Sequence, residues 1–283
     1  MGDKHLPVAL PRTGPLLCFG GPYSNQEATR AMREEATRLG IPADRVICTG
    51  DIVAYCANPN EAATEIRDWG CHVIKGNCEE QLAQRADGCG CGFNDSSSCD
   101  LLSRAWYSYA DAALTDDLRT WMQGLPDTLV FNFAERTFCI IHGGVCQTSR
   151  FIFPSTPAVE KSAELDAANA DVVIAGHSGI PFIEPIGQRI WFNPGVIGMP
   201  ANDGTPDGWF GLITPEANSS LRFTLKRLPY DATGAATALS ASGYAPPYAE
   251  ALINGRWPSR DVLPSEEATA TGHALRETDY LMF

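Results

Sequence analysis

The sequence predicts an α/β fold whose strands are buried and largely parallel. Two features of the pattern lead to this prediction. Short apolar runs, rich in β-branched or large side chains, end abruptly at glycine or at a polar residue, and segments of helical character lie between them. Strands that are covered on both faces form continuous apolar runs, so this order is typical of a parallel sheet with helices packed on it. The 283 residues suffice for one large α/β domain or two small ones.

Strands and helices alternate along the first two thirds of the chain. The apolar runs that predict strands span residues 15–20, 45–50, 72–76, 138–141 and 171–176. The segments that predict helices span residues 25–39, 60–69, 98–113 and 115–124. After residue 180, shorter apolar runs separated by turn residues predict an antiparallel meander of strands at 182–186, 188–192, 208–213 and 221–228.

The last fifty residues have a different composition. Stretches rich in alanine and proline predict helices near residues 235–242 and 247–254, followed by a loosely ordered tail. No internal repeat or linker divides the chain. We therefore predict a single domain over residues 1–283, in which residues 231–283 form a C-terminal helical extension and tail.

The composition is that of an ordinary folded protein, with 44% hydrophobic and 19% charged residues. No run of about 18 apolar residues is present, which excludes a transmembrane helix. The formal charge of −13 argues against binding to a nucleic-acid backbone. The N-terminal residues lack the continuous apolar segment of a secretory signal, so we predict a cytoplasmic protein. Its ten cysteines are then free thiols, metal ligands or redox groups rather than a disulfide framework.

Four potential metal ligands follow four of the predicted strands, each beside a glycine: Asp51, Asn77, His142 and His177. In an open α/β sheet, ligands bind beyond the carboxyl ends of the strands. A carboxylate, an amide oxygen and two imidazoles suit Mn, Fe or Zn. Taken singly, the Asp and the Asn are typical turn or N-cap residues, and a lone His is more often a hydrogen-bonded structural group. Their joint placement favours a metal site.

The motifs around these four residues resemble those of the calcineurin-like metallophosphoesterase superfamily, and in particular its bacterial branch of diadenosine-tetraphosphatase-like phosphatases. The segments that carry the resemblance, in chain order, are Thr49-Gly50-Asp51, Gly76-Asn77-Cys78-Glu79, Ile141-His142-Gly143 and Gly176-His177. The resemblance covers about residues 15–230. It implies a four-layer α/β-β-α sandwich that normally carries two metal ions.

The sequence departs from the family at the ligands of one ion. The resemblance places Gly21 and Tyr23 at the Asp and His of the family's first motif, and Gly179 at the second His of its last motif. Those lost side chains would hold the first ion, whereas Asp51, Asn77, His142 and His177 would hold the second. We therefore expect one divalent transition metal ion per chain, Fe, Mn or Zn, with a second ion left open.

Three further residues are candidates for catalysis. Cys78 stands where many relatives carry the His thought to act as general acid on the leaving group. Tyr23 could donate a hydrogen bond to the substrate or fill the vacated volume. Arg150 is a candidate phosphate contact, or else a solvated side chain.

A cysteine-rich segment follows the third predicted strand and contains Cys89, Cys91 and Cys99. Three interpretations stay open: a lid whose thiols serve as metal ligands or redox groups, a structural zinc site with a fourth ligand, and thiols that are reduced or form a local disulfide. Cys56 and Cys146 could also lie near the site, so a second ion bound by thiolates is conceivable.

The leading hypothesis is a metal-dependent hydrolase of a phosphorylated small molecule, which could be a phosphomonoester, a phosphodiester or a nucleotide polyphosphate. One alternative is a catalytically inactive relative that binds a phosphorylated small molecule or a partner protein. Another is iron- and thiol-dependent redox chemistry at the same site. The strand-rich second half and the tail could supply the surface of a homodimer.

Overall fold

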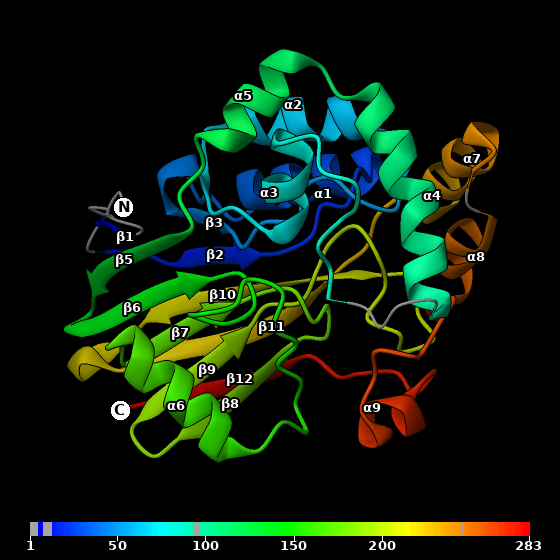
Figure 1. The fold of residues 1–283 in the computed structure, drawn as a ribbon. Coiled ribbons are helices and arrows are strands. Elements are labelled where there is room, and N and C mark those ends of the chain that lie inside the picture. Colours follow the sequence, from blue (N-terminus) through cyan, green and yellow to red (C-terminus); the bar gives the residue numbers. More distant parts are fainter. Residues whose placement is uncertain (1–4, 8–12, 93–96, 245) are drawn as a thin grey trace.

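The computed structural model describes residues 5–7, 13–92, 97–244 and 246–283. The prediction of a cytoplasmic location rests on the N-terminal segment, and residues 1–4 and 8–12 of that segment lie outside the described residues. Two six-stranded sheets lie face to face, and helices cover the outer side of each (Figure 1). This arrangement confirms the predicted four-layer α/β-β-α sandwich. None of the helices in the described part of the chain is long and apolar enough to cross a lipid bilayer.

The first sheet has the strand order β12-β11-β10-β2-β3-β4. Strands β2, β3 and β4 are parallel to one another, whereas β10 is antiparallel to both β2 and β11, and β12 is antiparallel to β11. The strands are β2 (Leu16–Phe19), β3 (Val46–Cys48), β4 (His72–Val73), β10 (Gly208–Pro215), β11 (Leu221–Leu228) and β12 (Thr278–Met282). The first three confirm predicted strands.

The second sheet has the order β1-β5-β6-β7-β9-β8. Strands β6, β7 and β9 are parallel neighbours, while β5 and β8 are antiparallel to β6 and β9, respectively. The strands are β1 (His5–Pro7), β5 (Thr128–Phe133), β6 (Arg136–Ile141), β7 (Val172–Ala175), β8 (Phe182–Ile186) and β9 (Arg189–Asn193). The predicted strands at 138–141 and 171–176 thus form the centre of this sheet.

Helices cover the outer faces of both sheets. Those on the side of the first sheet are α1 (Gln26–Arg38), α2 (Pro59–Trp69), α3 (Asn77–Ala83), α4 (Ser98–Ala113), α5 (Asp116–Gln123), α7 (Ala232–Ser242) and α8 (Pro246–Asn254). The second sheet is covered by α6 (Ala158–Ala168), and α9 (Ser265–Ala270) lies apart from the other helices (Figure 1). Two short 3₁₀ turns span Ala43–Arg45 and Ala217–Ser219.

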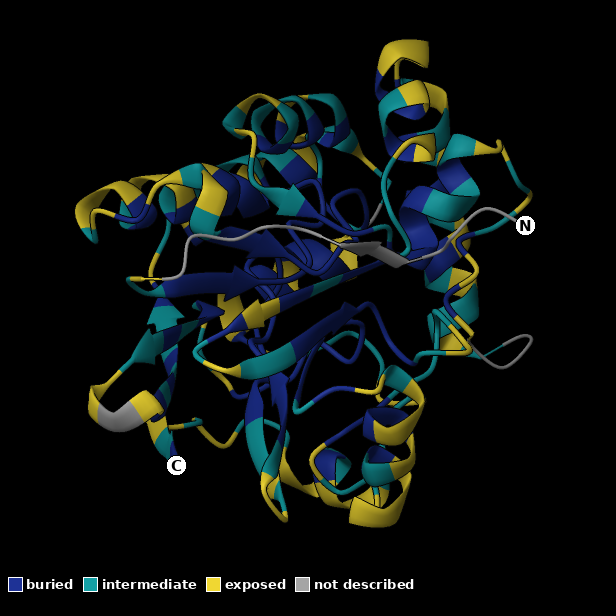
Figure 2. Ribbon diagram, turned by 90° about the vertical axis from the view of Figure 1, so that its left-hand side faces the viewer, coloured by how far each residue is buried: buried dark blue, intermediate teal, exposed yellow. Residues whose placement is uncertain are grey.

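Three apolar cores hold the layers together, and both sheets are largely buried (Figure 2). Between the sheets, Leu16 and Ile47 of the first belong to one buried cluster with Phe138 and Phe192 of the second. A strand between two layers is buried on both faces, and this burial explains the continuous apolar runs in the sequence. The two other cores lie beneath the helices on either side.

Two predictions about the second half of the chain were wrong. The strands after residue 180 form not one meander but two antiparallel hairpins in different sheets, because β9 pairs in parallel with β7 whereas β10 pairs with β2. The end of the chain is not a loosely ordered tail, because it forms α9 and then β12, which pairs with β11 along five residues. Burial of Met282 fixes that edge strand on the core.

Arg227 links β11 to the segments that precede β10 and β12. Its guanidinium lies 2.7 Å from Oδ2 of the buried Asp203, donates to the carbonyl of Leu275 and stacks 4.6 Å from the ring of Trp209. We expect Arg227→Ala to lower the free energy of unfolding by about 3 kcal/mol, because the Asp203 carboxylate stays buried without its main cation. Arg222→Ala is the control, because the ion pairs of Arg222 are exposed. In urea denaturation, its free energy of unfolding should fall by less than about 1 kcal/mol. Equal losses would contradict this account.

Candidate metal centre

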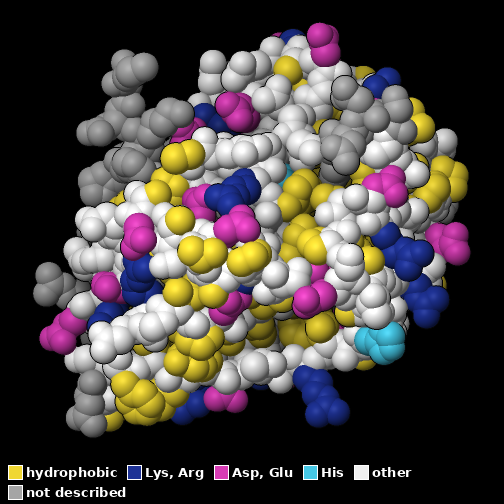
Figure 3. Space-filling model, turned by 60° about the horizontal axis from the view of Figure 1, so that its bottom comes forward, with side chains coloured by type: hydrophobic (Ala, Val, Ile, Leu, Met, Phe, Trp, Pro, Cys, Tyr) yellow, Lys and Arg dark blue, Asp and Glu magenta, His cyan; other side chains and the backbone are white. Residues whose placement is uncertain are grey.

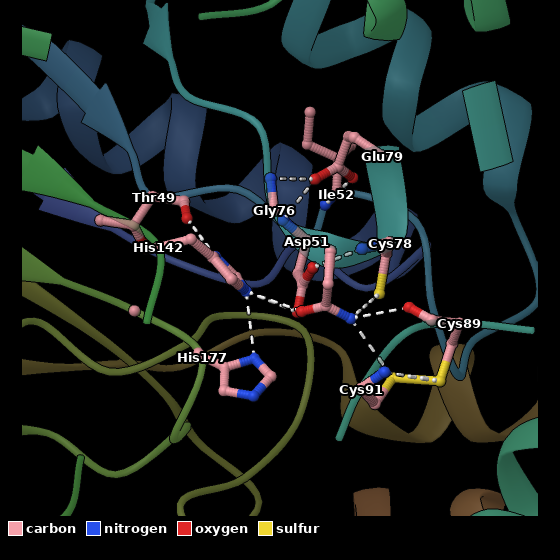
Figure 4. A network of polar contacts seen from close by, with 12 residues as sticks. Thr49, Asp51, Ile52, Gly76, Cys78, Glu79, Cys89, Cys91, His142 and His177 are labelled. Atoms are coloured by element: carbon pink, nitrogen blue, oxygen red, sulfur yellow. Dashed lines mark hydrogen bonds and ion pairs between the residues drawn. A yellow bond between two sulfur atoms is a disulfide. The ribbon is translucent and has the colours of Figure 1, made fainter. Parts of the chain in front are cut away.

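The four predicted ligands meet beyond the carboxyl ends of strands from both sheets, where Asp51, His142 and His177 point toward one another (Figure 4) and Oδ1 of Asn77 also approaches His142. Asp51 lies three residues beyond β3, and Asn77 begins α3 four residues beyond β4. His142 follows β6 without a gap, and His177 lies two residues beyond β7. The two sheets therefore contribute two ligands each, and all four side chains are buried.

Close packing of the strand ends explains the glycine beside each ligand. A Cβ atom on Gly176 would lie 2.4 Å from Oγ1 of Thr49, and one on Gly50 would lie 2.6 Å from the backbone nitrogen of Gly76. Asp51 and His177 themselves have φ values of 57° and 60°. Non-glycine residues seldom adopt this left-handed conformation, and where they do, it often marks a functional site.

The ring nitrogens of His142 have different partners. Nδ1 lies 2.6 Å from the carbonyl oxygen of Thr49, which can only accept a hydrogen bond, so Nδ1 carries the proton. In the neutral ring, Nε2 then presents a lone pair to the cluster. This nitrogen lies 3.2 Å from Oδ2 of Asp51, 3.1 Å from Oδ1 of Asn77 and 3.1 Å from Nδ1 of His177.

The lone pairs of these atoms face one another, and a bound cation would offset their mutual repulsion. A carboxylate oxygen and an amide oxygen only accept hydrogen bonds, so a proton on His177 would satisfy just one of the three contacts with His142. Ligand atoms about 2.1 Å from one ion are separated by about 3.0 Å in an octahedron and about 3.4 Å in a tetrahedron. The three distances to Nε2 of His142 lie between these values, and the ligand atoms of Asp51, His142 and His177 all lie within 4.8 Å of one another. The donor set and its spacing fit a divalent transition metal ion.

Contacts on the side away from His142 fix the orientation of the Asn77 side chain. Its Nδ2 donates to the carbonyl oxygen of Cys89 at 2.9 Å and lies 3.4 Å from Sγ of Cys91 and 3.6 Å from Sγ of Cys78. Because the NH₂ group faces these acceptors, the amide oxygen faces the cluster. The cysteine-rich segment thus orients a candidate metal ligand, a role that the sequence alone did not reveal.

The protonation states of Asp51 and His177 also suit a metal site. Burial acts to raise the pKa of Asp51, but the neighbouring His142 outweighs it and lowers the pKa to about 2. Burial, together with the charge of His142, lowers the pKa of His177 to about 3. Metal binding requires an ionised carboxylate and a neutral imidazole, and these residues have those forms at neutral pH. Burial acts to lower the pKa of His142, but Asp51 prevails and raises it, so without metal a proton can serve as the cation.

Glu79 supports the loop that carries Asp51, and sequence reasoning missed it. Its fully buried carboxylate accepts hydrogen bonds from the backbone nitrogens of Asp51 at 2.7 Å, Ile52 at 2.7 Å and Gly76 at 2.9 Å. Burial and the charge of Asp51 raise the pKa of Glu79 to about 7. Its position, three residues after the N-cap Gly76 of α3, is that of the acidic residue in a capping box, a signal that could have identified it.

The structure places the three catalytic candidates differently. Tyr23 is buried and lines a cavity together with Asp51. Cys78 lies beside Asn77, and burial followed by the charges of Asp51 and Glu79 raises the pKa of its thiol well above the usual value, so the thiol is neutral. Arg150 contacts the carboxylates of two glutamates, Glu160 and Glu164, and is not among the residues that line this cavity.

The cysteine-rich segment contains a disulfide between Cys89 and Cys91, while Cys99 is free and lies on α4. The local-disulfide interpretation is therefore confirmed for this pair. Cys56 is buried near the carbonyl of Gly198, and Cys146 is exposed. Within the described residues, the grouped side chains that could hold a metal ion are Asp51, His142 and His177, with no thiol among them.

Aromatic rings crowd two of the positions at which the resemblance expects ligands of the first ion. A Cβ atom on Gly21 would lie 2.5 Å from Cζ of Tyr23, and one on Gly179 would lie 3.2 Å from Cζ2 of Trp257. The rings of Tyr23 and Trp257 thus occupy the space into which a carboxylate and an imidazole would project.

Comparisons with known proteins agree with this site. A family model described as the calcineurin-like phosphoesterase superfamily domain matches residues 23–216. An uncharacterized protein of Methanocaldococcus jannaschii is 24% identical over 198 residues, which are 63% of this chain and 74% of that protein.

Two crystal structures share the fold. A metallophosphoesterase from Sphaerobacter thermophilus matches with a TM-score of 0.68, and a hypothetical protein from Pyrococcus horikoshii matches with a TM-score of 0.72. Each is 18% identical, and each match covers 86% of this chain and 99% of the other. The family model spans well over half of the chain and includes all four predicted ligands. The chain therefore belongs to the calcineurin-like phosphoesterase superfamily and is a metallophosphoesterase, that is, a phosphatase or phosphodiesterase.

Proposed function

We propose that the protein hydrolyses phosphate esters of a small molecule with a single divalent ion, Mn, Fe or Zn, held by Asp51, Asn77, His142 and His177. The observation that carries this proposal is the convergence of three lone-pair donors at 3.1–3.2 Å on Nε2 of His142. An ion bound by these residues supplies a Lewis acid that polarises a phosphoryl oxygen and lowers the pKa of a water molecule.

The chain itself holds these ligands ready before substrate binds. Thr49 fixes the tautomer of His142, Cys89 fixes the amide of Asn77, and Glu79 fixes the loop of Asp51. The ring of Phe151 lies 4.1 Å from that of His177 and shields it from water. Because these contacts already exist, little reorganisation is needed during the reaction.

In this proposal, Tyr23 acts on the substrate side of the centre, and Cys78 acts from behind Asn77, outside the cavity that Tyr23 lines. The Tyr23 hydroxyl donates a hydrogen bond to the phosphoryl group, since Tyr23 and Asp51 line the same cavity. The neutral thiol of Cys78 serves as a proton donor rather than a nucleophile, because the thiolate is the nucleophilic form. Arg150 would first have to leave Glu160 and Glu164 in order to bind phosphate.

Metal analysis tests the proposal. After chelation and reloading with Mn, Fe or Zn, we expect mass spectrometry to find one ion per chain, and we expect hydrolysis of p-nitrophenyl phosphate to require that ion. Chelator should abolish turnover, and re-added metal should restore it. Two tightly bound ions per chain would overturn the single-ion proposal, whereas the absence of binding for all three metals would overturn the proposed hydrolase.

One observation favours a second candidate, a non-catalytic binding protein. The positions of the family's first ion are filled by the rings of Tyr23 and Trp257, so a paired-ion mechanism is unavailable here. A protein that binds one ion and a phosphonate tightly, yet hydrolyses no phosphate ester with any of the three metals, would support this candidate.

A further inference from the structure

A narrow cavity lies directly beside the metal centre. Its volume is about 80 Å³, and among the described residues seventeen line it, including Asp51 and His177. Most of the remaining wall is apolar, and it includes five aromatic rings. They belong to Tyr23, Tyr55, Phe151, Tyr248 and Trp257. We refer to this cavity as the aromatic slot.

The walls of the aromatic slot are fixed in place by contacts of their own. The ring of Tyr55 lies 4.8 Å from that of Tyr23 and 5.0 Å from that of Tyr248. The indole nitrogen of Trp257 donates to the carbonyl of Pro200 at 2.7 Å, and its backbone nitrogen donates to the side chain of Asn202 at 2.8 Å. A preformed apolar cavity binds a fitting ligand without the cost of ordering its walls.

The aromatic slot contains no cation for a second phosphate group. None of the described residues that line it is a lysine or an arginine. Arg150 is paired with two glutamates, and the net charge of the chain is −13. On the face shown in Figure 3, acidic and basic side chains are interspersed, with hydrophobic side chains between them. A polyphosphate chain that entered the slot would lose its hydration without gaining a charge partner.

We infer that the aromatic slot binds the organic substituent of the substrate, and that this substituent is small, flat and uncharged. The inference rests on the proposed function, since that function places the phosphoryl group on the ion beside Asp51 and His177. An apolar cavity of about 150 Å³ encloses a benzene molecule, so the smaller slot encloses at most part of a single ring and cannot enclose a nucleoside. The substrate class is therefore a monophosphate ester of a small aromatic or apolar alcohol, not a nucleotide polyphosphate.

Binding of two phosphonates to the metal-loaded protein tests the inference without turnover. We expect calorimetry to show that phenylphosphonate binds about 10-fold more tightly than methylphosphonate, because part of the ring leaves water. Val262 lines the slot, and Val262→Trp, whose larger side chain takes up its free volume, should remove this difference by weakening the binding of phenylphosphonate. Leu102→Trp serves as a second variant with the same expected result, and Val159→Trp, at an exposed position on α6, should match the parent protein.

Measurements of turnover distinguish a failure of the inference about the slot from a failure of the proposed hydrolase function. Benzyl phosphate should exceed ethyl phosphate in kcat/KM by about 10-fold, although both esters release an alkyl alcohol of similar reactivity. Equal rates for the two esters, a preference for a nucleoside triphosphate, or equal affinities for the two phosphonates would overturn the inference. If neither ester is hydrolysed while phenylphosphonate still binds more tightly, the slot is supported and the proposed hydrolase fails.

Discussion

Replacing His142 with alanine is expected to remove metal binding and to lower phosphoesterase activity by about 1,000-fold, which corresponds to the several kcal/mol that a catalytic ion supplies. His142 is the ligand of choice for this test because Asp51, Asn77 and His177 all approach its Nε2 within 3.2 Å. Without the imidazole, the remaining donors lose the atom on which they converge. Titration with Mn²⁺ by calorimetry, followed by assays with p-nitrophenyl phosphate, measures both effects.

His273→Ala is the matched control, since His273 is exposed and contacts only the end of its own helix in the described part of the chain. It should keep the metal stoichiometry and the activity of the parent protein. A His142→Ala variant that binds one ion with unchanged affinity would show that the centre lies elsewhere. A variant that loses the ion but retains full turnover would contradict the metal-dependent mechanism.

Glu79→Ala is expected to destabilise the fold by about 4 kcal/mol or more, because three buried backbone N–H groups would lose their acceptor. The groups belong to Asp51, Ile52 and Gly76, so the damage falls on the segments that carry two of the proposed ligands. Urea unfolding of the metal-free protein measures this loss directly. In the folded fraction, metal affinity should also fall by about 10- to 100-fold, as it does when partners of metal ligands are removed.

Two comparisons make the Glu79 result interpretable. Glu79→Gln keeps one acceptor oxygen and should have an intermediate effect, since its NH₂ group would face a backbone N–H. Glu80→Ala changes the next residue of α3, which is only half-buried, and should cost less than about 1 kcal/mol. If Glu79→Ala and Glu80→Ala unfold at the same urea concentration, the hydrogen bonds of Glu79 contribute little to the fold.

The central strands and the positions of the four candidate ligands at strand ends could be predicted because their signals are local. Each strand between two layers is a continuous apolar run, and each ligand follows such a run beside a glycine. Parallel strands bring their carboxyl ends to one edge of a sheet. Residues that follow strands of one sheet, such as His142 and His177, could therefore be placed together without knowledge of the strand order, whereas the approach of Asp51 to His177 depends on how the two sheets pack.

Features that depend on distant partners could not be predicted. Helix α6 lacks a clear apolar stripe because its buried face contains Lys161 and Glu164, and Lys161 pairs with Glu184 on another element. The assignment of the two C-terminal hairpins to different sheets depends on strand pairing far along the chain. The amide orientation of Asn77 depends on a carbonyl of Cys89, which no periodicity reveals.

Trp257, which closes the space above Gly179, comes from the stretch between α8 and α9, outside residues 23–216 that match the family model. Part of the wall that faces the rest of the substrate is thus encoded outside the matched region, whereas the proposed ligands and the rings of Tyr23, Tyr55 and Phe151 lie within it. Mutations in the appended stretch can alter which compounds are accepted while the ligand sphere stays intact. Such a division lets a lineage explore new substrates without first losing its catalyst.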